Sequence, residues 1–148
     1  MIRIILICLI TTFSGMVYSQ DSLWLHPPVK HKVGLAGTFG ELRNNHFHTG
    51  IDIKSSNGKT GDQILAVADG KISRIKISAF GYGHVLYVDH PNGYTSVYAH
   101  LEKFRPDIEK WVYEAQTKMQ SYELDTNFVE SIFSVSQGEM IGIMGVTG

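Results

Sequence analysis

Short runs of apolar residues, many of them β-branched, alternate with glycine-containing turns through most of the chain. Residues 33–36, 47–53, 64–67 and 71–78 are such runs, and each of them predicts a strand. Asp69-Gly70 separates the last two runs and predicts a hairpin, because glycine tolerates the positive φ of a tight turn.

The second half of the chain continues the same pattern. Residues 85–90 and 94–100 flank Pro91-Asn92-Gly93, which is a second hairpin signal. Residues 133–135 and 140–144 predict two more short strands around a glycine turn.

One segment has helical rather than strand spacing. Residues 106–120 place apolar side chains three or four positions apart, and proline is tolerated in the first turn of a helix. These apolar side chains are Ile108, Trp111, Val112, Ala115 and Met119. We interpret the stripe as packing surface, and we predict a mostly β fold: an antiparallel sheet core with this one inserted helix.

Residues 1–19 predict a secretory signal peptide. Arg3 supplies a positive start, residues 4–13 form an apolar run, and Val17 and Ser19 fit a cleavage site after Ser19. An uncleaved anchor is the alternative, but a membrane-spanning helix needs about 20 apolar residues, and polar residues interrupt this run sooner. We therefore expect an exported protein, periplasmic or extracellular, with no transmembrane span after cleavage.

The rest of the chain divides into a lead-in segment, residues 20–32, and one domain, residues 33–148. Its 148 residues, 43% hydrophobic and 18% charged, describe an ordinary globular chain. A net charge of -1 without a basic, aromatic-rich patch argues against nucleic acid as a partner. The single cysteine, Cys8, lies in the predicted signal peptide, so the mature chain would have no disulfide, zinc–thiolate site or cysteine nucleophile.

His48 and Asp52 are residue types that bind zinc, and Gly50 lies midway between them. A catalytic zinc ion usually has three protein ligands and one position open for water. On a straight strand, residues four apart lie about 13 Å from each other, too far to share an ion. The backbone must therefore bend between the two side chains, and Gly50 is where a bend or bulge costs least.

His100 follows the predicted strand that begins at residue 94. A histidine at a strand end can reach a cleft and hydrogen-bond a developing oxyanion; a half-exposed structural histidine is the alternative. His46, two residues before His48, is either a group that supports the site or a solvated loop histidine. We interpret His84 and His90 as structural or surface residues.

Four segments occur in a characteristic order: residues 47–53 (FHTGIDI), 66–72 (AVADGKI), 97–101 (VYAHL) and 137–142 (QGEMIG). This series closely resembles the lysostaphin-type (β-lytic) zinc metallopeptidases, a family that hydrolyses the peptide cross-bridges of bacterial peptidoglycan. The resemblance covers about residues 33–148.

The resemblance implies a zinc metalloendopeptidase with peptidoglycan peptides as its substrate and Zn²⁺ as its cofactor. It implies that His48 and Asp52 are two of the three zinc ligands, and that His100 helps to stabilise the transition state. Residues 106–128 look like an insertion after the Tyr-Ala-His-Leu motif.

The sequence departs from the family at its end. In the family, a Gly-x-Thr-Gly element is followed by a His-x-His pair, which supplies the third zinc ligand and another catalytic histidine. The sequence ends at Val146-Thr147-Gly148, where we expect that pair to begin, with Met144 and Val146 in a core strand.

Two interpretations stay open: a fragment of a zinc endopeptidase with little activity of its own, or a non-catalytic module that binds cell wall or regulates another hydrolase. A lipoyl- or biotinyl-type carrier domain is disfavoured, because Lys71 lacks the setting of a modifiable lysine.

Overall fold

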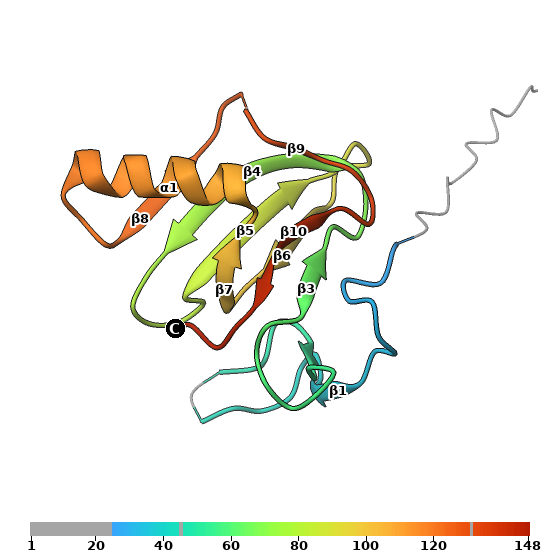
Figure 1. The fold of residues 1–148 in the computed structure, drawn as a ribbon. Coiled ribbons are helices and arrows are strands. Elements are labelled where there is room, and N and C mark those ends of the chain that lie inside the picture. Colours follow the sequence, from blue (N-terminus) through green and yellow to red (C-terminus); the bar gives the residue numbers. More distant parts are fainter. Residues whose placement is uncertain (1–24, 45, 131) are drawn as a thin grey trace, which may run out of the picture.

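The computed structural model describes residues 25–44, 46–130 and 132–148 (Figure 1). The predicted signal peptide and Cys8 lie outside these described residues. Within them, antiparallel strands form three sheets, and one helix packs beside them. The prediction of a mostly β fold with one inserted helix is confirmed.

The largest sheet contains five strands and is centred on β4 (Gly70–Ile77). β5 (His84–Asp89) pairs with one edge of β4, and β6 (Thr95–Tyr98) extends the sheet beyond β5. On the other edge of β4 lie two shorter strands, β8 (Leu124–Asn127) and β9 (Ser134–Val135). β4 and β5 are thus the two central strands of this sheet, and each has neighbouring strands on both of its edges.

The structure contains one of the two predicted hairpins. β5 and β6 pair across Gly93, whose φ of 84° lies in the left-handed region that glycine favours. The hairpin predicted at Asp69-Gly70 is wrong, because β3 (Gln63–Leu65) belongs to a different sheet from β4. Gly70 instead opens β4, where a Cβ would lie 2.6 Å from a backbone oxygen of β5. Close strand packing, not a turn, requires a glycine there.

The second sheet has three strands, with β10 (Met140–Met144) between β3 and β7 (Leu101–Phe104). Helix α1 (Pro106–Met119) follows β7 almost directly and runs along the large sheet (Figure 1). Pro106 occupies its first turn, as predicted, and Gln120 ends it in a left-handed conformation with φ 51°.

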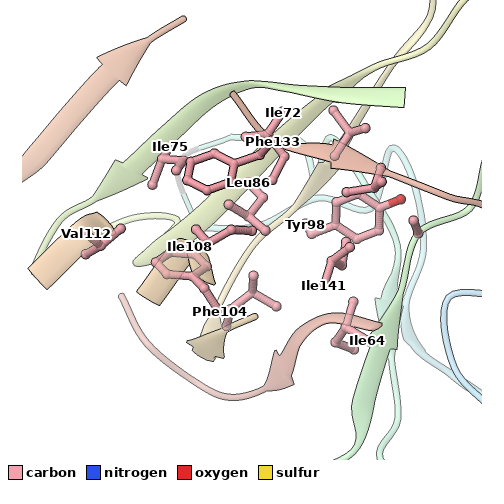
Figure 2. Close-up of a cluster of buried hydrophobic side chains, with 14 of the residues drawn as sticks. Ile64, Ile72, Ile75, Leu86, Tyr98, Phe104, Ile108, Val112, Phe133 and Ile141 are labelled. Carbon is pink, nitrogen blue, oxygen red and sulfur yellow. The ribbon is translucent and has the colours of Figure 1, made fainter. Parts of the chain in front are cut away.

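The core lies between the two larger sheets and the helix. Figure 2 shows side chains from these elements converging on one cluster. Its fully buried members include Ile72, Ile75, Leu86, Ile108 and Ile141. Burying one such side chain is worth about 1.5–3 kcal/mol, so this cluster is the main source of stability. The predicted helical stripe contributes Ile108 and Val112 to it, which confirms its packing role.

The third sheet is small and lies at the edge of the core, against which its residue Ile53 packs (Figure 1). It consists of β1 (Leu35–Gly37) and β2 (Asp52–Ile53). The strand predicted over residues 47–53 is therefore wrong for most of its length. Residues 38–44 and 46–51 lie between these strands, and there the backbone N–H of His48 donates to Glu41 O at 2.8 Å. We call residues 35–44 and 46–53 the ligand lobe.

Residues near both ends of the described chain pack against the rest of the domain. Val29, in the predicted lead-in, is only 2% exposed and belongs to the core cluster. At the other end, Val146 lies beyond β10 and is 82% exposed, so the expectation that it belongs to a core strand is wrong. Gly148 packs beside Gly81 in the turn between β4 and β5.

Candidate metal centre

His48 and Asp52 converge in the ligand lobe. The backbone bends at Gly50, and His48 Nε2 comes to 3.2 Å from Asp52 Oδ1. Zinc–ligand bonds of about 2.0–2.2 Å at a tetrahedral angle put two ligand atoms roughly 3.3–3.5 Å apart. The separation of these two atoms therefore fits two ligands of one ion.

The other ring nitrogen of His48 is held by the backbone. Its Nδ1–H donates to the carbonyl oxygen of Thr38 at 3.0 Å, so Nε2 is the nitrogen that faces Asp52. A backbone carbonyl on the remote nitrogen is one of the usual partners by which proteins orient a metal-binding histidine. The tautomer of His48 that this contact selects leaves the Nε2 lone pair for a metal ion.

Asp52 is oriented by an arginine. Arg43 Nη2 donates to Asp52 Oδ2 at 2.7 Å, which leaves Oδ1 turned towards His48. Gly37 makes room for this ion pair, because a Cβ at that position would overlap Asp52 Oδ2 and Arg43 Nη2. Glu41 lies 3.5 Å from the same guanidinium. One oxygen of the Asp52 carboxylate is thus bound by Arg43, and the other faces His48.

His100 lies between β6 and β7 in a left-handed conformation, with φ 58°. Its Nδ1–H donates to Thr147 O at 2.7 Å, and its backbone N–H donates to Tyr82 O at 2.9 Å. With Nδ1 engaged, Nε2 is the ring nitrogen left for chemistry. A left-handed backbone in a residue other than glycine costs about 1 kcal/mol or more and occurs often at functional positions.

Tyr82 connects His100 to the ligand lobe. Its ring meets the His100 ring edge-on, with centroids 6.3 Å apart. Its hydroxyl lies 2.9 Å from the hydroxyl of Thr49, the residue that follows His48. The structure thus brings His48 and Asp52 into direct contact and links His100 to them through Tyr82.

The remaining histidines have other surroundings. His46 is exposed, and its carbonyl accepts the Arg43 N–H at 2.9 Å. His90 is 6% exposed and is hydrogen-bonded at both nitrogens, to Asp69 O and Ser96 Oγ. His84 contacts Tyr122 Oη at 3.1 Å. These contacts agree with a structural role for both histidines, which stays a prediction.

Within residues 25–44, 46–130 and 132–148, no group of three or more histidine, cysteine, aspartate or glutamate side chains could hold a metal ion. The described part of the chain therefore offers a pair of ligands, His48 and Asp52. Sequence reasoning did not identify Thr38, Arg43, Tyr82 or Thr147 as parts of this site. Each of them acts on a residue at least nine positions away, and no local pattern carries that information.

The ligand lobe also exposes large apolar side chains. Leu42 and Phe47 are bridge partners and are 73% and 65% exposed, and Phe39 and Ile51 are exposed as well. Neighbouring exposed apolar side chains on one loop are typical of a surface that binds another molecule.

An antiparallel β fold with a converging histidine and aspartate is consistent with a domain of peptidase family M23. Residues 46–117 match peptidase family M23, and this match includes His48, Asp52 and His100. The resemblance predicted from the sequence motifs is confirmed.

Two curated relatives align with three quarters of the chain. The chain is 30% identical over 111 residues to the murein hydrolase activator NlpD of Escherichia coli (strain K12) and to the protein of the same name from Shigella flexneri. The alignment covers 75% of this chain and 22% of each relative, so the chain spans about a fifth of their length. In the described residues, we find no helix long and apolar enough to cross a bilayer.

Proposed function

We propose that this domain is the zinc-binding part of an exported metalloendopeptidase that hydrolyses peptide cross-links of peptidoglycan. One observation carries the proposal: His48 Nε2 and Asp52 Oδ1 face each other at 3.2 Å, while Thr38 and Arg43 engage the remaining polar atoms of both side chains. Such a pair presents two ligand atoms towards one point. The match to peptidase family M23 supports zinc as the metal that this pair would bind.

The residues of the site have distinct tasks. Zinc, when bound, would polarise the scissile carbonyl and make a water molecule nucleophilic at neutral pH. His48 and Asp52 would hold the metal. His100 would stabilise the oxyanion of the tetrahedral intermediate from Nε2. Because Nδ1–H is already donated to Thr147 O, His100 can donate this second bond only in its protonated form.

The surface of the ligand lobe suits a peptide substrate. Phe39, Leu42 and Phe47 are exposed on the same loop that presents His48. A peptide laid across this loop would cover apolar surface close to the metal ligands, and that burial would contribute to its binding. The net charge of -1 gives no general attraction to polyanions.

The 148-residue chain itself should be a poor enzyme. Its described residues offer two metal ligands, whereas a catalytic zinc site usually has three. We therefore expect weak zinc binding and little hydrolysis of cross-linked peptides by this chain alone.

A second candidate function is a non-catalytic module that stimulates another cell-wall hydrolase. It is favoured by the match to proteins named murein hydrolase activators. Retention of both His48 and Asp52 in a metal-binding arrangement favours the enzyme.

The coding sequence beyond Gly148 separates the two candidates. A continuation that encodes a His-x-His pair should be expressed with the domain and tested for release of cross-linked peptides from purified peptidoglycan. The enzyme proposal predicts cleavage that a chelator and His48→Ala abolish, with Tyr113→Ala as the matched control. An extended chain that cleaves nothing but stimulates an added murein hydrolase would establish the second function, as would a confirmed stop codon together with such stimulation.

A further inference from the structure

We propose that Tyr82 is a positioning residue that holds His100 at a set distance from the metal ligands, and that Thr49 is its anchor in the ligand lobe. This inference rests on the proposed function, because it assigns Tyr82 a task in the same site.

Tyr82 makes contacts on both sides of the site. Towards His100 it offers its carbonyl to the backbone N–H at 2.9 Å and its ring edge-on. Towards the ligand lobe, its hydroxyl hydrogen-bonds Thr49 Oγ1 at 2.9 Å. Thr49 lies between the two candidate ligands in sequence, so this bond reaches the segment that carries them.

The turn that carries Tyr82 is shaped to present it. Gly81 and Gly83 flank it with φ of 76° and 60°, a conformation that other residues adopt only with strain. A Cβ on Gly83 would overlap Thr147, whose carbonyl accepts the His100 Nδ1–H. The turn joins β4 and β5, the longest pair of the large sheet, and so has a rigid base.

The ligand lobe needs an external anchor. Its own sheet consists of β1 and the two-residue strand β2, and residues 38–44 and 46–51 lie between them in the chain. Tyr82 is 47% exposed, so its ring adds little to the core. The Tyr82 hydroxyl bonds Thr49, and its ring contacts His100. These contacts suit a residue that holds two segments together better than one that packs in the core.

Cobalt(II) gives a readout that does not need hydrolysis. A high-spin Co²⁺ ion at His48 and Asp52 shifts the ring-proton NMR signals of His100, and the shift falls with the cube of their distance. Tyr82→Phe and Thr49→Val each remove the hydroxyl bond. We expect each to change the shift from its wild-type value, because without this bond the His100 ring is no longer held at one distance from the ion. Thr49→Ser keeps the hydroxyl and should restore the wild-type shift.

The controls separate this inference from the proposed function. Tyr113→Phe makes the same chemical change on the exposed face of α1 and should leave the His100 shift as in the wild type. His48→Ala should abolish the shift; its persistence, or its lack in the wild-type chain at a Co²⁺ concentration high enough to fill a weak site, overturns the metal site and with it the proposed function. An unchanged shift in both Tyr82→Phe and Thr49→Val, with Co²⁺ bound, overturns the role of Tyr82 alone.

Discussion

The ligand lobe is held in place by other interactions than the body of the domain, by which we mean the two larger sheets and helix α1. In the body, β4 pairs along its length with neighbouring strands, and Ile72, Ile75 and Ile108 are fully buried. In the ligand lobe, Leu42 and Phe47 are exposed, and Asp52 is held by Arg43. The body is stabilised by apolar burial, and the lobe is positioned by a few polar contacts. Loss of buried apolar side chains in the body should therefore cost stability, and loss of polar contacts in the lobe should cost metal binding.

Ile108→Ala should produce the largest loss of stability. Ile108 is completely buried and packs the inserted helix against the core, so its truncation should lower the free energy of unfolding by about 2–5 kcal/mol. Denaturant unfolding measures this loss. Tyr113→Ala, on the exposed face of the same helix, should change stability by less than about 1 kcal/mol. Equal losses in the two variants would contradict the assignment of the helix stripe to the core.

Tyr98→Phe should have an intermediate effect that depends on pH. The Tyr98 hydroxyl accepts the Val67 N–H at 2.9 Å, and leaving this donor unpaired should cost about 1–3 kcal/mol at neutral pH. Burial raises the pKa of the Tyr98 phenol above its usual value, so the unfolded chain loses this proton more readily than the folded chain. Wild-type stability should accordingly fall as the pH rises above about 10 and through the folded pKa.

The phenylalanine variant cannot lose that proton, so its stability should decline less steeply in the alkaline range. Unfolding curves at neutral pH and above pH 10 compare the two proteins. Parallel alkaline declines in both would show that Tyr98 does not carry this linkage.

Gly83→Ala tests the junction between the body and the site. The left-handed φ of 60° costs a non-glycine residue about 1 kcal/mol, and the new Cβ must also displace Thr147. Gly81→Ala is the matched control, because its φ of 76° is similar but its Cβ would meet open space. Both variants should lose stability in thermal unfolding. Gly83→Ala should alter the NMR signals of His100 more than Gly81→Ala does, and equal alterations would contradict the role of Thr147.

Gly50→Ala should have the smallest effect. The backbone bends at Gly50, yet its φ is not left-handed and a Cβ there would meet nothing within 4 Å. Stability should change by less than about 0.5–1 kcal/mol, and metal affinity should persist. Unfolding and metal titration of this variant check both statements; loss of metal binding would show that the bend itself requires glycine.

The sequence predicted the body better than the ligand lobe, and the reason is physical. Helix α1 and the β5–β6 hairpin follow from residue spacing and turn chemistry, because their stabilising contacts are local or periodic. The prediction of a hairpin at Asp69-Gly70 was wrong because β3 pairs with β10, which follows α1 in the chain, and not with β4. Pairing between strands that are distant in sequence cannot be predicted from the local pattern of apolar and polar residues.

The candidate ligands could be predicted because residue type, spacing and family motif coincide at His48 and Asp52. Their conformation could not, because it depends on the Thr38 carbonyl, on Arg43 and on the space at Gly37. The position of His100 likewise depends on Tyr82 and Thr147, from two separate parts of the chain. The sequence thus indicates the chemistry of the pair, and the fold supplies its geometry.

Zinc titration of the purified chain tests the central claim most directly. Competition against a chromophoric chelator should reveal one weak site per chain, whose affinity falls by at least about tenfold in His48→Ala and in Asp52→Asn. His26→Ala and Asp125→Asn are the matched controls and should bind zinc as the wild type does. Equal zinc affinity in the wild type, His48→Ala and Asp52→Asn would contradict the claim that these two side chains form the metal site.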